Sequence, residues 1–69
     1  MTYNDYHKTY TNKAKGYPIN ACKRALEDCH YTLKLWGAEI SAEYSTRLWA
    51  EIDAMRERIA YLQRKTTGA

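Results

Sequence analysis

The chain has 69 residues, only two cysteines and a formal net charge of +3, which allow one small domain and exclude a disulfide framework. Its first residues lack the apolar run of a signal peptide, and no stretch approaches the roughly 20 apolar residues of a membrane span. We therefore expect a cytoplasmic protein with reduced thiols and no membrane contact. Because a core of this size rarely supplies more than about 3–5 kcal/mol, a partner is expected to add stability.

Residues 1–17 form a basic, tyrosine-rich N-terminal tail. Its apolar side chains recur at spacings that would line one helical face: Tyr3, Tyr6, Tyr10, Ala14 and Tyr17. The threonines and asparagines between them lower the helix propensity of the segment. The tail is therefore predicted to be extended or a short helix, and to be ordered only by contact with the rest of the chain, a neighbour or a ligand.

Residues 18–36 are predicted to form a helix with one strongly apolar face. The face consists of residues alternately three and four positions apart: Ile19, Cys22, Leu26, Cys29, Leu33, Trp36 and, past the helix, Ile40. Pro18 suits the start of a helix, where its missing N–H would have no partner in any case. Gly37 is a residue type at which helices commonly end.

A second apolar stripe predicts another helix over residues 42–65: Leu48, Ile52, Met55, Ile59 and Leu62. The two stripes are out of phase, so one straight helix would place them on different faces. We therefore predict an all-α protein built as an antiparallel two-helix hairpin, with Ser41 or Ser45 capping the second helix. One long helix bent near Gly37 is the alternative. Residues 66–69 are expected to be a frayed C-terminus.

Large apolar side chains outside both stripes favour self-assembly. Tyr31 and Leu35 flank the first stripe, and Trp49 and Tyr61 flank the second. Burying one such side chain contributes about 1.5–3 kcal/mol, and several left exposed on so small a protein would form an unusual patch. We therefore expect the hairpins to assemble into an oligomeric helical bundle.

Cys22, Cys29 and His30 are residue types from which a metal site or a nucleophile can be built. Along one helix, however, the two sulfurs would lie about 10 Å apart, too far to share a zinc ion or form a disulfide. Both cysteines occupy stripe positions, where a free thiol packs as a small hydrophobe. The chain also lacks a glycine-rich phosphate loop and a Ser-His-Asp pattern. We expect no metal, no cofactor and no enzymatic activity.

The strongest functional signal is the alternation of lysine and tyrosine residues in the tail. Positive charge is concentrated at the two ends of the chain, and the tail is one of these ends. Lysines contact phosphates, and tyrosine rings provide faces on which bases stack. We predict an anion-binding site built from Tyr10, Lys13, Lys15, Tyr17 and Arg47. The alternative is that the tyrosines pack on the helices as hydrophobic bodies with their hydroxyls in water.

A helical hairpin preceded by Lys13, Lys15, Gly16 and Tyr17, with Arg47 early in its second helix, resembles small phage anti-defence proteins, in particular oligomeric sponges that trap cyclic-nucleotide immune signals. The resemblance is one of general plan. It implies a homo-oligomer in the host cytoplasm that sequesters a small anionic nucleotide. The alternative function is a nucleic-acid-binding or host-protein-binding inhibitor, as in anti-CRISPR proteins, although the acidic residues among the arginines of the second helix argue against DNA recognition.

Overall fold

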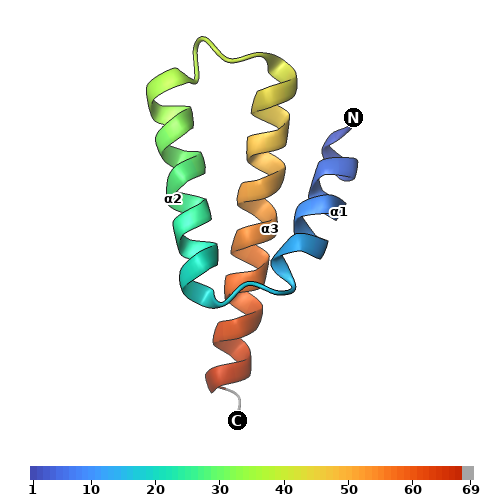
Figure 1. Ribbon diagram of the computed structural model, residues 1–69, viewed down its shortest axis with the longest axis vertical. Helices are drawn as coiled ribbons and strands as arrows, with labels where there is room; N and C mark the ends of the chain where they lie inside the picture. Colours follow the sequence, from blue (N-terminus) through green and yellow to red (C-terminus); the bar gives the residue numbers. More distant parts are fainter. Residues whose placement is uncertain (68–69) are drawn as a thin grey trace.

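The computed structural model describes residues 1–67, and over that range it contains helices and no strands. Helix α1 spans Tyr3–Ala14, helix α2 spans Ile19–Trp36 and helix α3 spans Ala42–Thr67 (Figure 1). The all-α class is confirmed, but the plan of two helices and a tail is incomplete because the tail contributes a third helix. Residues 68–69, which belong to the expected frayed end, lie outside the described residues.

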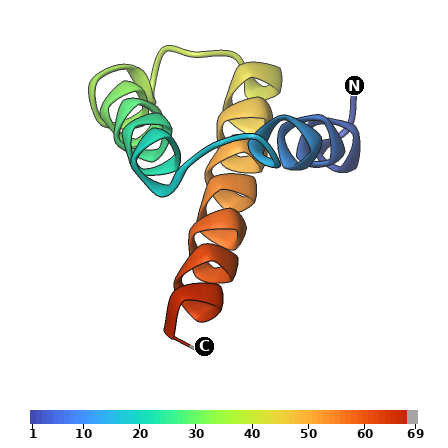
Figure 2. The ribbon, with the colours of Figure 1, turned by 60° about the horizontal axis from the view of Figure 1, so that its bottom comes forward.

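Helix α3 is the shared partner of the other two helices. Helix α1 runs parallel to it and helix α2 antiparallel, one on each side, and the substantial interhelical contacts are those with α3 (Figures 1 and 2). The molecule is therefore a flat arrangement of 44 × 24 × 15 Å and not a closed three-helix bundle. Within residues 1–67, no helix combines the length and the apolarity needed to cross a bilayer.

The two apolar stripes meet between α2 and α3. One buried cluster joins Cys29 with Leu48 and Ile52, and Leu26, Leu33 and Ile40 pack against it. A second cluster joins Cys22 with Met55 and with Ala14 of α1, so that all three helices contribute to it. Trp36 departs from the stripe, because it is the last residue of α2 and remains 53% exposed.

The segments between the helices contain residues that cap or end a helix. Pro18 precedes α2 as its N-cap, and the Ser41 hydroxyl accepts a hydrogen bond of 3.1 Å from the Tyr44 N–H at the start of α3. Residues 37–41 separate α2 from α3, so the two are not one bent helix. Gly37 has φ −54°, and a Cβ there would lie 2.4 Å from the Leu33 carbonyl oxygen. The glycine is therefore required by close approach and not by a left-handed turn.

Helix α1 forms in spite of its poor helix propensity for two reasons. A capping box starts it: the Thr2 hydroxyl accepts from the Asp5 N–H at 3.3 Å, and the Asp5 carboxylate accepts from the Thr2 N–H at 3.1 Å. The helix then packs on α3, where Ala50 is 0% exposed and Ala54 is 2% exposed. Small side chains at these positions let the backbones approach, and Tyr10 is buried on the facing side of α1.

Candidate anion-binding site

Arg58 is the most unusual charged residue in the structure. Its side chain is half-buried, and it donates one hydrogen bond of 3.1 Å from Nη2 to the Lys15 carbonyl oxygen. Its guanidinium carbon lies 5.3 Å from the centroid of the Tyr61 ring. Among residues 1–67, no carboxylate pairs with this guanidinium, and its buried Nε has no hydrogen-bond acceptor. Buried charges are normally paired, so Arg58 retains unused donor capacity.

Two hollows share Arg58 in their walls. The larger, of about 420 Å³, lies at the start of α2 and is lined by Gly16, Tyr17, Pro18, Ile19, Arg58 and Leu62. The smaller, of about 260 Å³, lies between α1 and α3 and is lined by Thr11, Ala14, Lys15, Ala54, Glu57, Arg58 and Tyr61. The segment that links α1 to α2 contributes to both hollows. Arg58 thus stands at the boundary of two adjacent spaces that a ligand can enter.

A second unpaired polar atom lies at the smaller hollow. The Thr11 hydroxyl is buried and, like Arg58 Nε, finds no hydrogen-bond partner in the part of the chain that the structure describes. Both residues line the same hollow. A buried polar atom without a partner usually marks a place where water or a ligand completes the hydrogen bonding. Here the two residues that carry such atoms line one hollow, Thr11 from α1 and Arg58 from α3.

Glu57 also lines the smaller hollow, and its carboxylate contacts a side chain of α1. The His7 ring nitrogen Nε2 lies 2.9 Å from one Glu57 oxygen and 3.1 Å from the other. Glu57 therefore contacts α1, while Arg58 keeps its free donors. The lining is otherwise apolar apart from Thr11 and Lys15, which strengthens the interaction of a cation with an anion placed there.

The structure brings together two of the residues that the sequence predicts for the site. Arg47 Nε donates a hydrogen bond of 2.6 Å to the Tyr10 hydroxyl. The Arg47 guanidinium carbon also lies 6.0 Å from the Tyr10 ring centroid and 5.8 Å from that of Tyr44. Tyr10 itself is only 8% exposed, so it acts as part of the α1–α3 interface. This contact engages Tyr10 and Arg47 with each other.

The other three predicted residues lie further along the chain towards Arg58. Lys13 and Lys15 are exposed, and Lys15 lines the smaller hollow through its position at the end of α1. Tyr17 is half-buried, packs against the Ala14–Cys22–Met55 cluster and lines the larger hollow. Neither hollow is lined by Tyr10, Lys13 or Arg47. The predicted set is therefore divided: Tyr10 and Arg47 form an interhelical contact, Lys15 and Tyr17 line the hollows, and Lys13 takes part in neither.

Sequence reasoning missed Arg58 and Tyr61 because α3 reads as a solvated face of alternating charges. A usable signal is nevertheless present. The residues three and four positions from Arg58 are Ala54, Met55, Tyr61 and Leu62, none of them acidic, so no neighbour within one turn can pair with it. Arg47, by comparison, has Glu43 and Glu51 at those distances.

The two thiols are placed for packing. Cys22 is 0% exposed and Cys29 is 3% exposed. Burial raises the pKa of the Cys22 thiol, and burial together with the nearby Glu51 carboxylate raises the pKa of Cys29 to about 12. Both thiols are thus protonated at neutral pH, which makes them poor nucleophiles. Over the described range, no three His, Cys, Asp or Glu side chains are grouped so that they could hold a metal ion.

Comparison of the chain with protein-family models, curated proteins and solved structures gives no match.

Proposed function

We propose that this protein is a non-catalytic binding protein that holds the phosphate group of a small anionic nucleotide beside Arg58. One observation carries the proposal: Arg58 and Thr11, whose Nε and Oγ1 atoms are buried without hydrogen-bond partners, both line the hollow between α1 and α3. A phosphate oxygen accepts hydrogen bonds from both kinds of donor. The guanidinium is a group that binds phosphate with directed hydrogen bonds and with charge.

The surroundings of Arg58 suit the remainder of a nucleotide. Tyr61 in the smaller hollow and Tyr17 in the larger one supply aromatic faces on which a base can stack. The exposed Lys15 adds positive charge at the rim. The hollows, of about 260 and 420 Å³, lie near the lower end of the size range of small-molecule sites, about 300–1,000 Å³. A mononucleotide or a compact dinucleotide is the class of ligand that fits.

The proposed role is sequestration, in which binding alone keeps the ligand from other proteins. The protonated thiols of Cys22 and Cys29 support the non-catalytic part of this proposal. The resemblance in general plan to phage anti-defence sponges supports the part that concerns an immune signal. In that role the protein acts stoichiometrically, so its concentration must match that of the signal.

Calorimetric titration tests the binding proposal. The ligands are pyrophosphate, ADP, cyclic dinucleotides, cyclic ADP-ribose isomers and short DNA, and the variants are Arg58→Gln and the matched control Arg56→Gln on the exposed side of α3. Hydrogen bonds to a charged group are worth about 1.5–3 kcal/mol, so Arg58→Gln should weaken phosphate binding between about tenfold and a hundredfold. Arg56→Gln should leave it unchanged. Equal affinities in the two variants, or no binding of any phosphate ligand, would refute the proposal.

The two lysines that the sequence singled out provide a further arm of the same experiment. Replacing Lys13 and Lys15 by alanine should flatten the salt dependence of binding, because fewer positive charges then face the ligand. The melting temperature should hardly change, since both side chains are exposed and exposed charges contribute little to stability. Steeply salt-dependent binding of DNA in place of a small ligand would favour the nucleic-acid alternative.

Self-assembly is the second part of the proposal, and exposed apolar side chains support it. Near the loop between α2 and α3, Tyr31 is 64% exposed, Leu35 51%, Trp36 53% and Tyr44 43%. Several large apolar side chains left exposed on so small a protein favour burial against another copy. Light scattering at micromolar concentration should show a dimer or larger species, and Leu35→Glu should dissociate it. A stable monomer of 8.1 kDa would refute assembly.

The same exposed residues favour one alternative function, the binding of another protein. Tyrosine and tryptophan are the residue types that dominate the energetics of protein interfaces. If Arg58→Gln preserves the effect of the protein in the cell, and Leu35→Glu abolishes that effect without changing the oligomeric state, the partner is another protein and the nucleotide proposal fails.

A further inference from the structure

The smaller hollow beside Arg58 is assembled from two helices. Thr11, Ala14 and Lys15 come from α1 and its C-terminal cap, while Ala54, Arg58 and Tyr61 come from α3. The Lys15 carbonyl oxygen also accepts the hydrogen bond that holds the Arg58 guanidinium. If α1 leaves α3, one wall of the hollow and this bond are both lost. The site therefore exists only while α1 is docked.

Helix α1 has few means of staying docked by apolar contact. Its buried side chains are Tyr10 and Ala14, and Ala14 packs in the cluster with Cys22 and Met55. A helix of 12 residues is marginal in water by itself, even with favourable residues. Folding of α1 and its docking on α3 are therefore expected to be a single event with a modest free energy.

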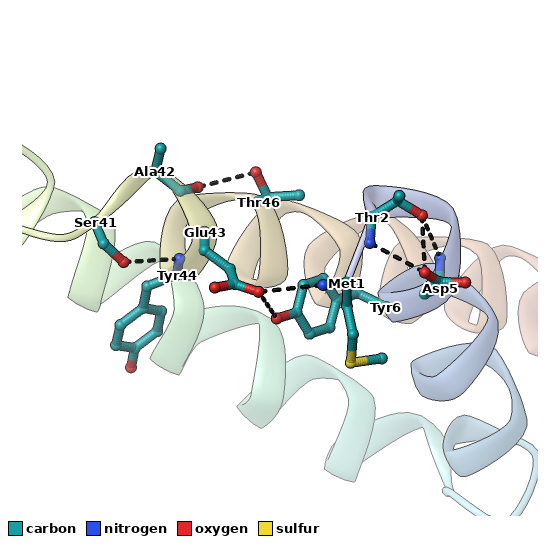
Figure 3. Close-up of polar contacts among 9 residues, drawn as sticks. All are labelled: Met1, Thr2, Asp5, Tyr6, Ser41, Ala42, Glu43, Tyr44 and Thr46. Carbon is teal, nitrogen blue, oxygen red and sulfur yellow. Dashed lines mark hydrogen bonds and ion pairs between the residues drawn. The ribbon is translucent and has the colours of Figure 1, made fainter.

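Polar contacts also join the first half of α1 to α3. The Tyr6 hydroxyl at 3.0 Å and the N-terminal ammonium group at 3.3 Å both donate to one oxygen of Glu43 (Figure 3). The Tyr3 hydroxyl donates to the Asp53 carboxylate. These bonds lower the pKa of Glu43 and raise the pKa of Tyr3 to about 12. Tyr6 and Lys15 are about 14 Å apart along the helix axis, so the contact between Tyr6 and Glu43 is remote from the hollow. The contact between Tyr3 and Asp53 is nearer, because Asp53 directly precedes Ala54 of the hollow.

We propose that docking of α1 and binding of the anion beside Arg58 are thermodynamically coupled, with Tyr3 and Tyr6 as positioning residues that act on the site through the docking of α1. This inference rests on the proposed function. A ligand that binds only the docked form has an apparent affinity reduced by the fraction of molecules in that form. By the same linkage, the ligand must hold α1 in place.

Hydrogen exchange of the α1 amides, measured with and without pyrophosphate, tests the coupling. In the wild type, pyrophosphate at 100 times its dissociation constant should slow exchange through α1 undocking about a hundredfold. The double variant Tyr3→Phe/Tyr6→Phe should exchange its α1 amides faster and its α2 and α3 amides as before. The affinity of the double variant for pyrophosphate should fall by the ratio of its docked fraction to that of the wild type. Saturating pyrophosphate should restore the protection of its α1 amides. Tyr31→Phe, the same change at an exposed position of α2, should alter neither measurement.

The outcomes separate the two proposals. Unchanged affinity in a double variant whose α1 amides have lost protection would overturn the coupling while leaving the Arg58 site intact. Pyrophosphate binding that leaves exchange of the wild-type α1 amides unaltered would do the same. A double variant with fully protected α1 amides would remove Tyr3 and Tyr6 as positioning residues. Failure of the wild type to bind pyrophosphate would overturn the proposed function, and the coupling with it.

Discussion

Leu48 and Leu35 form a matched pair that tests the packing of the structure. Leu48 is 5% exposed and belongs to the cluster with Cys29 and Ile52, whereas Leu35 is 51% exposed on α2. Replacing a buried leucine by alanine costs about 2–5 kcal/mol through lost transfer energy and the cavity left behind. At an exposed position the same substitution usually changes stability by less than about 0.5 kcal/mol. We therefore expect Leu48→Ala to be strongly destabilising and Leu35→Ala to be nearly neutral.

Urea unfolding followed by far-ultraviolet circular dichroism measures both costs. A chain of 69 residues has a total free energy of unfolding of roughly 3–10 kcal/mol, so Leu48→Ala should remove a large part of it and populate the unfolded state without denaturant. Equal midpoints for Leu48→Ala and the wild type would show that the α2–α3 seam is misplaced. If Leu35→Ala lowers the free energy of unfolding only at higher protein concentration, Leu35 is covered by another copy of the chain.

Three further outcomes follow from local geometry. Gly37→Ala should destabilise the protein by about 1–3 kcal/mol in the same unfolding assay, because its Cβ would overlap the Leu33 carbonyl oxygen. The hydrogen bonds that Glu43 accepts hold its pKa below the ordinary value, so ionised Glu43 stabilises the fold at neutral pH. This stabilisation is lost as the pH falls from about 4.3, the ordinary pKa of glutamate, through the lowered pKa of Glu43. When ellipticity is followed during acid titration, the wild type should show this loss of stability. The Glu43→Gln variant should lack the part of the loss that protonation of Glu43 causes. Cys22 and Cys29 should resist a disulfide reagent at neutral pH until the chain unfolds, and rapid labelling of the folded protein would contradict their burial.

The seam between α2 and α3 was accessible to sequence reasoning because its period is simple. Apolar residues three and four positions apart identify a helical face regardless of its partner, and Cys29, Leu48 and Ile52 are buried on those faces. Trp36 shows the limit of the method, since periodicity does not say where a helix stops being covered.

Helix α1 was harder to predict because its stability depends on contacts distant in sequence. Propensity argued against a helix, and the Thr2–Asp5 capping box together with the contact surface on α3 outweighs it. The candidate site was harder still. Arg58 and Thr11 are 47 positions apart, and neither stands out until folding places both at one hollow and leaves Arg58 Nε and the Thr11 hydroxyl without hydrogen-bond partners. Lys15 and Tyr17, which the sequence did single out, line the hollows from the linking segment.

The position of α3 between two helices that hardly touch has a consequence for how the molecule assembles in time. Helices α2 and α3 are joined by residues 37–41 alone, so their contacts close short loops. The hydrogen bonds between α1 and α3 join residues 37 to 50 positions apart, which makes them slower to form. The α2–α3 pair is therefore expected to form in an early kinetic phase and α1 to dock in a later one. A nascent or refolding chain would then acquire its helical core before it acquires the hollow beside Arg58.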